Sequence, residues 1–234
     1  FFNHAKYPFL ATEDVAMARA VLRAEVSKSV IAKASSSGAK VVNAVAAHLL
    51  ETSPQVDATV RHTFQPEQSG TLIVNELSVA EKPGLRVITG KLQRRVTLKN
   101  TSALHTRDWL ANIFAATEAA GISVNVVESP DNTCTMWMDD DQRKLGLVTE
   151  SLQLLGTIAD SHVVGLITCL EDGKRPARES NMDMQKIFAV LLENGIDVLD
   201  FSASSGSTVT LTVEGNQMVP CIRALHSTIV VLEN

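Results

Sequence analysis

The sequence has few aromatic residues, few cysteines and no long apolar run. Its 234 residues include seven Phe, two Trp and one Tyr, so Val, Leu, Ile and Ala have to pack the core. No apolar segment approaches the roughly 20 residues of a membrane-spanning helix, and we predict no membrane span. The net charge of −5 argues against a nucleic-acid partner, because phosphate binding needs a basic face.

The three cysteines, Cys134, Cys169 and Cys221, are widely spaced and form no Cys-x-x-Cys pair. This pattern predicts free, buried thiols in a reducing compartment, in preference to a disulfide framework, a metal site or a nucleophile. The histidines show no metal-ligand spacing with cysteines or carboxylates. The acidic run 139–141 could resemble a metal cluster, but we expect it to cap the helix that follows. We therefore predict no metal and no cofactor.

The first residue is Phe1, which indicates a processed or truncated chain. We expect the protein in the cytoplasm, or in an organelle matrix after loss of a transit peptide.

One segment of the sequence occurs twice. Residues 113–124 contain Ile-Phe-Ala and then Gly-Ile-x-Val, and the same residues recur at 187–198, with an offset of 74 at both ends. Each copy predicts an amphipathic helix that is ended by a glycine and followed by a β-strand. In the first copy we expect the helix to bury Leu110, Ile113, Phe114 and Thr117.

Apolar periodicity and turn residues predict the other elements. Helices are predicted at 12–34, 41–50, 108–120, 141–159, 182–193 and 217–227, and strands at 58–60, 71–74, 85–89, 95–99, 122–127, 133–138, 162–170, 196–201, 208–213 and 229–231. Each copy is then β-α-β-β-α with a further strand nearby, which predicts an α+β fold of two ferredoxin-like βαββαβ modules in tandem. Side-by-side pairing of such modules through their sheet edges would cover those edges and create a groove for a small ligand.

Several segments resemble the lysine-sensitive aspartate kinases, in family order over roughly residues 11 to 234. The run Thr-Ser-Ala-Leu-His-Thr-Arg-Asp-Trp-Leu at 101–110, continued by Ile-Ser-Val-Asn at 122–125, resembles the first ACT domain of that family. Residues 201–205 and 225–227 resemble the second ACT domain. Residues 37–42 and 69–73 resemble the end of the kinase domain.

The resemblance implies a division of the chain into three parts. Residues 1–80 would be a short α/β remnant of the amino-acid-kinase domain, residues 94–160 the first ACT module, and residues 85–93 with 161–234 the second. The family's Lys-Phe-Gly-Gly-Thr phosphate loop has no match here, and no two of the 12 glycines are adjacent. Because a phosphate cradle needs such glycines, we expect no catalytic residue and no kinase activity from this chain alone.

The resemblance also implies an effector site where the first module meets a second copy of itself. There the loop before the helix would hold the carboxylate of a free amino acid. The matching residues are Ala103, His105, Thr106, Trp109, Leu110, Asn125, Ser129 and Asp131. A remnant of a nucleotide site would lie at Lys40 and Val41, although a solvated Lys40 is the plainer expectation.

Some site residues depart from the family pattern. Asn125 stands where the family has an aspartate that pairs with the ligand's ammonium, and Pro130 removes an N–H. Asp131 could restore a carboxylate nearby. Trp109 replaces a phenylalanine and could pack on the ligand or in the core, and we expect His105 to be structural. Lysine, a different amino acid and no ligand at all remain open.

These implications favour an amino-acid-sensing, allosteric region of an aspartate kinase, which would control aspartate phosphorylation in lysine, threonine and methionine synthesis. Its partners would be an amino-acid effector and further subunits, as a homo-oligomer or a mixed assembly. The alternative is a kinase-less homologue that serves as a structural subunit of a larger complex. A small stand-alone enzyme lacks support, because no nucleophile and base are paired in the sequence.

Overall fold

The computed structural model describes residues 25–39, 41–61, 64, 66–67, 69–78, 84–172, 184–204 and 208–230. Lys40 and residues 12–24 of the first predicted helix lie outside these ranges. Within them, no helix has the length and apolar character needed to cross a bilayer.

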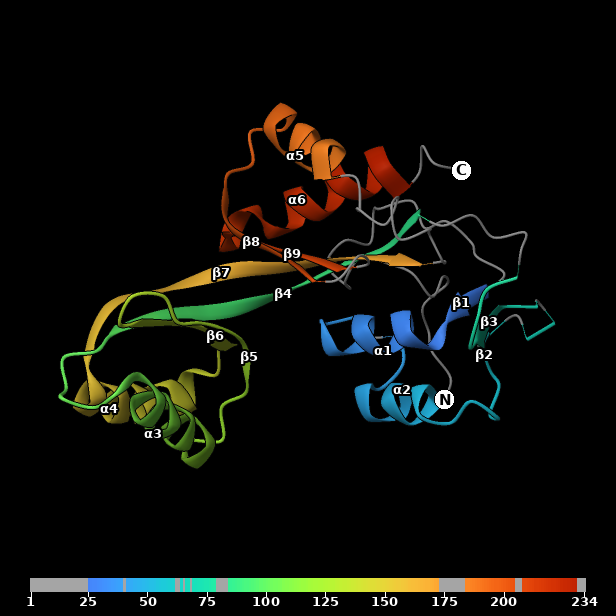
Figure 1. Cartoon of the computed structure of the whole chain (residues 1–234). Helices are drawn as coiled ribbons and strands as arrows, with labels where there is room; N and C mark the ends of the chain where they lie inside the picture. Colours follow the sequence, from blue (N-terminus) through green and yellow to red (C-terminus); the bar gives the residue numbers. More distant parts are fainter. Residues whose placement is uncertain are drawn as a thin grey trace. The chain divides into compact units, whose positions relative to one another are not determined.

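Helices and strands are interspersed along the chain (Figure 1). They are β1 (Glu25–Ser27), α1 (Lys28–Ser36), α2 (Ala44–Glu51), β2 (Ala58–Val60), β3 (Thr71–Val74), β4 (Gly84–Lys99), α3 (Thr106–Ala119), β5 (Val124–Glu128), β6 (Thr133–Asp139), α4 (Gln142–Leu155), β7 (Thr157–Asp172), α5 (Met184–Glu193), β8 (Val198–Ser204), β9 (Thr208–Glu214), the 3-10 turn η2 (Gly215–Gln217), α6 (Met218–Leu225) and the π-helical turn η3 (His226–Val230). One sheet has the order β1-β3-β2 and the other β5-β6-β4-β7-β9-β8. The predicted α+β fold with a repeated β-α-β-β-α order is confirmed.

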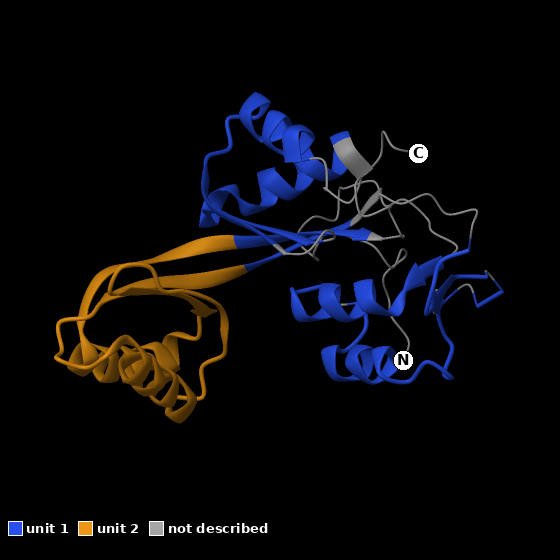
Figure 2. Cartoon of the chain, in the orientation of Figure 1, with its two compact units in different colours: residues 1–91, 166–234 blue, residues 92–165 orange. Residues whose placement is uncertain are grey.

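The chain divides into two compact units (Figure 2). Unit 1 contains residues 1–91 and 166–234, and unit 2 contains residues 92–165. The long strands β4 and β7 contribute residues to both units. The three-part division implied by the family resemblance stays a prediction.

Unit 2 packs α3 and α4 on one face of its strands. Its core combines residues of both helices and of the turn after α3 with alternate residues of β4 and β6: Val96, Leu98, Trp109, Ile113, Ile122, Cys134, Met136, Met138, Val148 and Leu152. The buried row of α3 is Trp109, Ile113 and Thr117, at steps of four residues. Leu110 is only partly buried, and the predicted burial of Phe114 is wrong, since 43% of its surface is exposed.

Unit 1 has two cores, because helices cover β4 and β7 on both faces. Ile88 and Ile167 lie in the core formed with α5 and α6. Val87 and Leu170, each an odd number of residues away on the same two strands, lie in the core formed with α1, α2 and the small sheet. Successive side chains of a strand point to opposite faces, so near-continuous apolar runs suit these strands.

The repeated glycine ends α3 and α5 in the same way. Gly121 has φ +63° and Gly195 φ +64°, the left-handed conformation that glycine adopts without strain. The N–H of Gly121 donates to Glu118 O at 2.8 Å and that of Ile122 to Thr117 O at 3.0 Å. The same two bonds recur in the second copy, so both helices end in a Schellman motif.

Some predicted boundaries are wrong. The strands predicted at 85–89 and 95–99 are one continuous strand, β4, because the polar residues between them are part of the ladder. The helix predicted to Ala159 ends at Leu155, and β7 begins at Thr157. At Gly156 a Cβ would lie 2.4 Å from the carbonyl oxygen of Lys99, so only glycine fits this close approach of two backbones.

Two further segments differ from the sequence-based expectation at the ends of the described chain. Residues 25–27, predicted as helix, form β1, which pairs with β3 in parallel. Residues 229–230, predicted as part of a strand, belong to the helical turn η3. Both segments are only two or three residues long. Pairing or packing with the rest of the fold, and not the intrinsic preference of so few residues for helix or strand, decides their conformation.

Candidate functional site

The predicted effector residues that precede α3 are exposed. Ala103, His105 and Thr106 lie in the loop between β4 and α3 and in the first turn of the helix. His105 is the N-cap residue, and its carbonyl oxygen accepts from the N–H of Trp109 at 3.0 Å. Its side chain makes no capping bond. The structural role expected for His105 stays a prediction. The N–H groups of this first turn suit a carboxylate.

Asn100 joins this loop to the turn between β5 and β6. Its side-chain amide donates to Leu104 O at 3.3 Å and to Asn132 Oδ1 at 3.2 Å. Its backbone N–H donates to Asn132 O at 2.9 Å. Ser129 and Asp131 of that turn are exposed, and Ser129 Oγ donates to the Thr133 carbonyl oxygen at 2.9 Å. The structure thus brings the predicted loop and turn residues to one end of unit 2.

Asn125 lies elsewhere, in a β-bulge at the start of β5. Val124 pairs with Met138 and Val126 with Trp137, so Asn125 is the extra residue of the strand. Its Nδ2 donates to Gln93 Oε1 at 2.7 Å and to Asp139 Oδ1 at 3.2 Å. Gln93 Nε2 also donates to Asp139 Oδ1, at 3.1 Å. These three residues are thus linked by side-chain hydrogen bonds.

The strand register separates this cluster from the loop before α3. Gln93 pairs with Asp139 at one end of the β4–β6 ladder and Lys99 with Thr133 at the other. Six residues of strand span roughly 20 Å. One chain therefore does not present Asn125 and the loop before α3 to the same small ligand.

Trp109 lies in the core of unit 2, with none of its surface exposed, and its Nε1 donates to Leu155 O at 2.8 Å. This position favours the core alternative over direct packing on a ligand. Leu110 beside it is half-buried.

The three acidic residues at 139–141 each interact with a different partner. Asp141 is the N-cap of α4 and accepts from the Arg143 N–H at 3.0 Å, which confirms a capping role at this position. Asp140 pairs with Arg94 at 2.9 Å, and Asp139 belongs to the Gln93 cluster. In the part of the chain that the structure describes, no three His, Cys, Asp or Glu side chains are grouped to hold a metal ion.

Sequence analysis missed a charged cluster around Trp137. The Arg95 guanidinium lies 5.6 Å from the centre of the Trp137 ring, and Arg95 Nη1 is 3.1 Å from Asp160 Oδ2. The same carboxylate oxygen is 2.9 Å from His162 Nδ1. In the sequence, Trp137 is part of an apolar strand and gives no sign of a charged partner. The cluster becomes visible once β4 and β6 are paired, because this pairing places Arg95 opposite Trp137.

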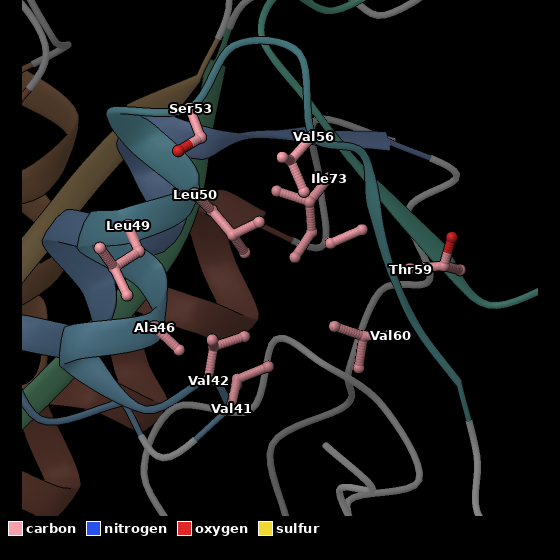
Figure 3. A pocket seen from close by; sticks show the side chains of 11 residues that line it. Val41, Val42, Ala46, Leu49, Leu50, Ser53, Val56, Thr59, Val60 and Ile73 are labelled. Atoms are coloured by element: carbon pink, nitrogen blue, oxygen red, sulfur yellow. The ribbon is translucent and has the colours of Figure 1, made fainter.

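Unit 1 contains an apolar cavity of about 380 Å³ (Figure 3). Its lining comes from the residues just before α2, from α2 itself, from the loop after it, and from β2 and β3: Val41, Val42, Ala46, Leu49, Leu50, Ser53, Val56, Ala58, Thr59, Val60 and Ile73. Val41 is the described member of the predicted nucleotide remnant. Among the described residues, the lining is apolar apart from the hydroxyls of Ser53 and Thr59.

The three thiols are free and buried, as predicted. Burial raises the pKa of Cys134 to about 11 and that of Cys221 to about 12, and it raises the pKa of Cys169 further still. A protonated, buried thiol is a poor nucleophile and a poor metal ligand.

No family model matches the chain. Aspartokinase 3, chloroplastic, of Arabidopsis thaliana is 24% identical over 181 residues, which are 74% of this chain and 32% of that protein. The chain thus spans about a third of the length of the curated relatives it matches.

Two solved structures share the fold. The aspartate kinase of Clostridium acetobutylicum superposes with a TM-score of 0.77 at 15% identity, over 97% of this chain and 53% of that one. E. coli aspartokinase III in complex with lysine and aspartate (T-state) gives 0.66 at 22% identity, over 88% of this chain and 46% of that one. The resemblance to part of an aspartate kinase, first seen in the sequence motifs, is confirmed.

Proposed function

We propose that this chain is an amino-acid-sensing, regulatory region of the aspartate-kinase type, built on two tandem ACT modules. The observation that carries the proposal is the exposed start of α3, which Asn100 joins to the turn after β5. This end of unit 2 offers backbone donors at a helix N-terminus, the Thr106 hydroxyl and the Asp131 carboxylate. Those groups match the two charges of a free amino acid.

The separation of Asn125 from this end supports a site shared by two copies of the chain. A free amino acid is much shorter than the roughly 20 Å of strand between them. Such a ligand contacts both Asn125 and the loop before α3 only where the loop of one copy meets β5 of another. A ligand at such an interface stabilises one dimer arrangement and shifts its population, which is how it would regulate aspartate phosphorylation in lysine, threonine and methionine synthesis.

Calorimetric titration of the purified chain with lysine, threonine and methionine tests the proposal. We expect saturable binding of at least one of them, weakened about tenfold by Asp131→Asn combined with Thr106→Ala. Ser151→Ala, which removes a hydroxyl from the exposed face of α4, is the matched control and should leave binding unchanged. Absence of binding for all three amino acids would contradict the proposal.

A second assay addresses catalysis by the same sample. With ATP, magnesium and aspartate we expect no acyl-phosphate, because the sequence has no glycine-paired phosphate loop. Turnover by the chain alone would overturn this expectation.

The alternative function is a structural subunit without a sensor. The hydrogen bonds among Gln93, Asn125 and Asp139 favour it, since these polar side chains bind one another. A chain that forms a stable oligomer, shows no binding in the titration and does not change its oligomeric state with any of the three amino acids would support this alternative.

A further inference from the structure

The cavity of unit 1 is a space that the described side chains leave open beside a core. It lies between α2 and the strands β2 and β3, where Leu50 and Val42 face Ile73 and Val60 (Figure 3). These four residues belong to the core formed with α1 and α2 or pack against it. Protein interiors contain few voids larger than a water molecule, so about 380 Å³ is more open space than ordinary packing leaves.

Small residues keep this cavity open. Ala46 of α2 and Ala58 of β2 both line it, and the side chain of each ends at Cβ. A longer aliphatic residue at either position would extend into the space. The larger lining residues Leu49 and Val56 are 59% and 44% exposed, so the apolar lining continues to the surface and gives a ligand access.

One wall of the cavity is held from behind by a buried lysine. Lys28 of α1 is 3% exposed, and its Nζ donates to Ser53 O at 2.9 Å and to Pro54 O at 3.2 Å. The side-chain amide of Asn75 also donates to Pro54 O, at 2.8 Å. Ser53 is part of the lining, whereas Lys28 is not. These bonds fix the loop after α2 in place, so the cavity is preformed, as small-molecule sites usually are.

The lining favours an uncharged aliphatic ligand. Nine of its eleven residues are Val, Leu, Ile or Ala, and the other two, Ser53 and Thr59, carry hydroxyls. Among the described residues, the lining thus has no charged side chain to pair with an ion and no aromatic ring to stack on. An engineered apolar cavity of about 150 Å³ holds benzene, so this larger cavity accommodates a chain of more than six carbons.

We propose that this cavity binds a free aliphatic molecule with one uncharged hydrogen-bonding head group, of the medium-chain alcohol type. Its chain lies between α2 and the strands, and its head group bonds to the hydroxyl of Ser53 or Thr59. A peptide segment fits this lining less well, because its backbone N–H and C=O groups would be buried among aliphatic side chains without partners. The inference concerns residues 41–73 and does not depend on an effector site at α3.

Calorimetric titration of the full chain with 1-octanol tests the inference. We expect saturable binding of one molecule per chain. Binding of 1-hexanol should be about tenfold weaker, because two fewer CH₂ groups are buried. Octanoate at pH 7.5 should also bind at least tenfold more weakly than 1-octanol, since its carboxylate loses water without gaining a cation.

A cavity-filling variant localises the binding. Ala46→Leu extends into the space and should abolish 1-octanol binding while the melting temperature stays equal or rises. Ala44→Leu, which adds the same side chain at an exposed position of α2, is the matched control and should bind as the wild type does. If Ala46→Leu does not fold, Ala58→Leu fills the cavity from the strand side.

Several outcomes would overturn the inference and leave the proposed function standing. One is the absence of saturable 1-octanol binding by the wild type. Another is a folded Ala46→Leu or Ala58→Leu chain that binds as the wild type does, or an equal loss of binding in the Ala44→Leu control. Because Val41 belongs to the predicted nucleotide remnant, the titration is repeated with 1 mM ADP. Loss of 1-octanol binding in its presence would assign the cavity to a nucleotide instead.

Discussion

At the residue scale, His226 is a buried histidine with a measurable consequence for stability. It is 3% exposed in η3, and its Nδ1 has no hydrogen-bond partner among the residues described. Burial lowers its pKa below the ordinary value of 6.5, so the folded protein holds it neutral. The unfolded chain binds a proton at this side chain as the pH falls below 6.5, and the folded chain does so only at lower pH. Stability is therefore lost on acidification through that window.

The corresponding prediction concerns His226→Gln. Between pH 7.5 and pH 5.5 the free energy of unfolding of the wild type should fall by up to about 1.4 kcal/mol per pH unit more than that of the variant. Urea unfolding followed by circular dichroism at both pH values measures the difference. His48→Gln, which replaces an exposed histidine of α2, is the control and should keep the wild-type dependence. Equal pH dependence of all three proteins would contradict the assignment.

At the element scale, the repeat was predictable because its signals are local. A glycine followed by an apolar residue encodes the Schellman motif directly, and both Ile122 and Ile196 are buried behind it. The full length of β4 was less predictable. Thr89 and Gln93 are polar yet completely buried, and this hides the alternation of apolar and polar residues that marks a strand. Strand register and bulges are set by pairing between distant segments. The sequence therefore placed Asn125 in a site but did not show that Asp139, expected to cap a helix, lies beside it.

Glycine substitutions test this account of the helices. Gly121→Ala and Gly195→Ala should each destabilise the protein by about 1 kcal/mol, because alanine is strained at positive φ. Gly146→Ala should stabilise it by roughly 0.5–1 kcal/mol, since this glycine lies inside α4 and a Cβ there meets nothing within 4 Å. Chemical denaturation of the three variants gives the signs. A stabilised Gly121→Ala chain would rule out the left-handed C′ position.

At the scale of the whole molecule, the duplicated module supplies its own control for ligand binding. The two copies share helix, glycine and bulge, but the bulged residue is Asn125 in the first and Leu199 in the second. In the first copy Asn100 also ties the loop before α3 to the turn after β5. An effector that binds as proposed contacts the first copy, and ordering of backbone by a ligand slows amide exchange locally.

Hydrogen–deuterium exchange with and without the bound amino acid should therefore show slower exchange in three segments of the first module: the loop 100–106, the bulge 124–126 and the turn 129–132. The bulge at 198–200 should be unchanged, because Leu199 has no polar group to offer a ligand. The two bulges occupy equivalent fold positions, so a general stabilisation of the sheet would slow exchange at both alike. Two outcomes would place the ligand away from the first module. One is slower exchange that is confined to residues 198–200. The other is equal slowing at the two bulges while calorimetry reports binding. Slower exchange at both the loop 100–106 and the bulge 124–126 would support a site shared between two copies, since one chain separates these segments by most of a strand.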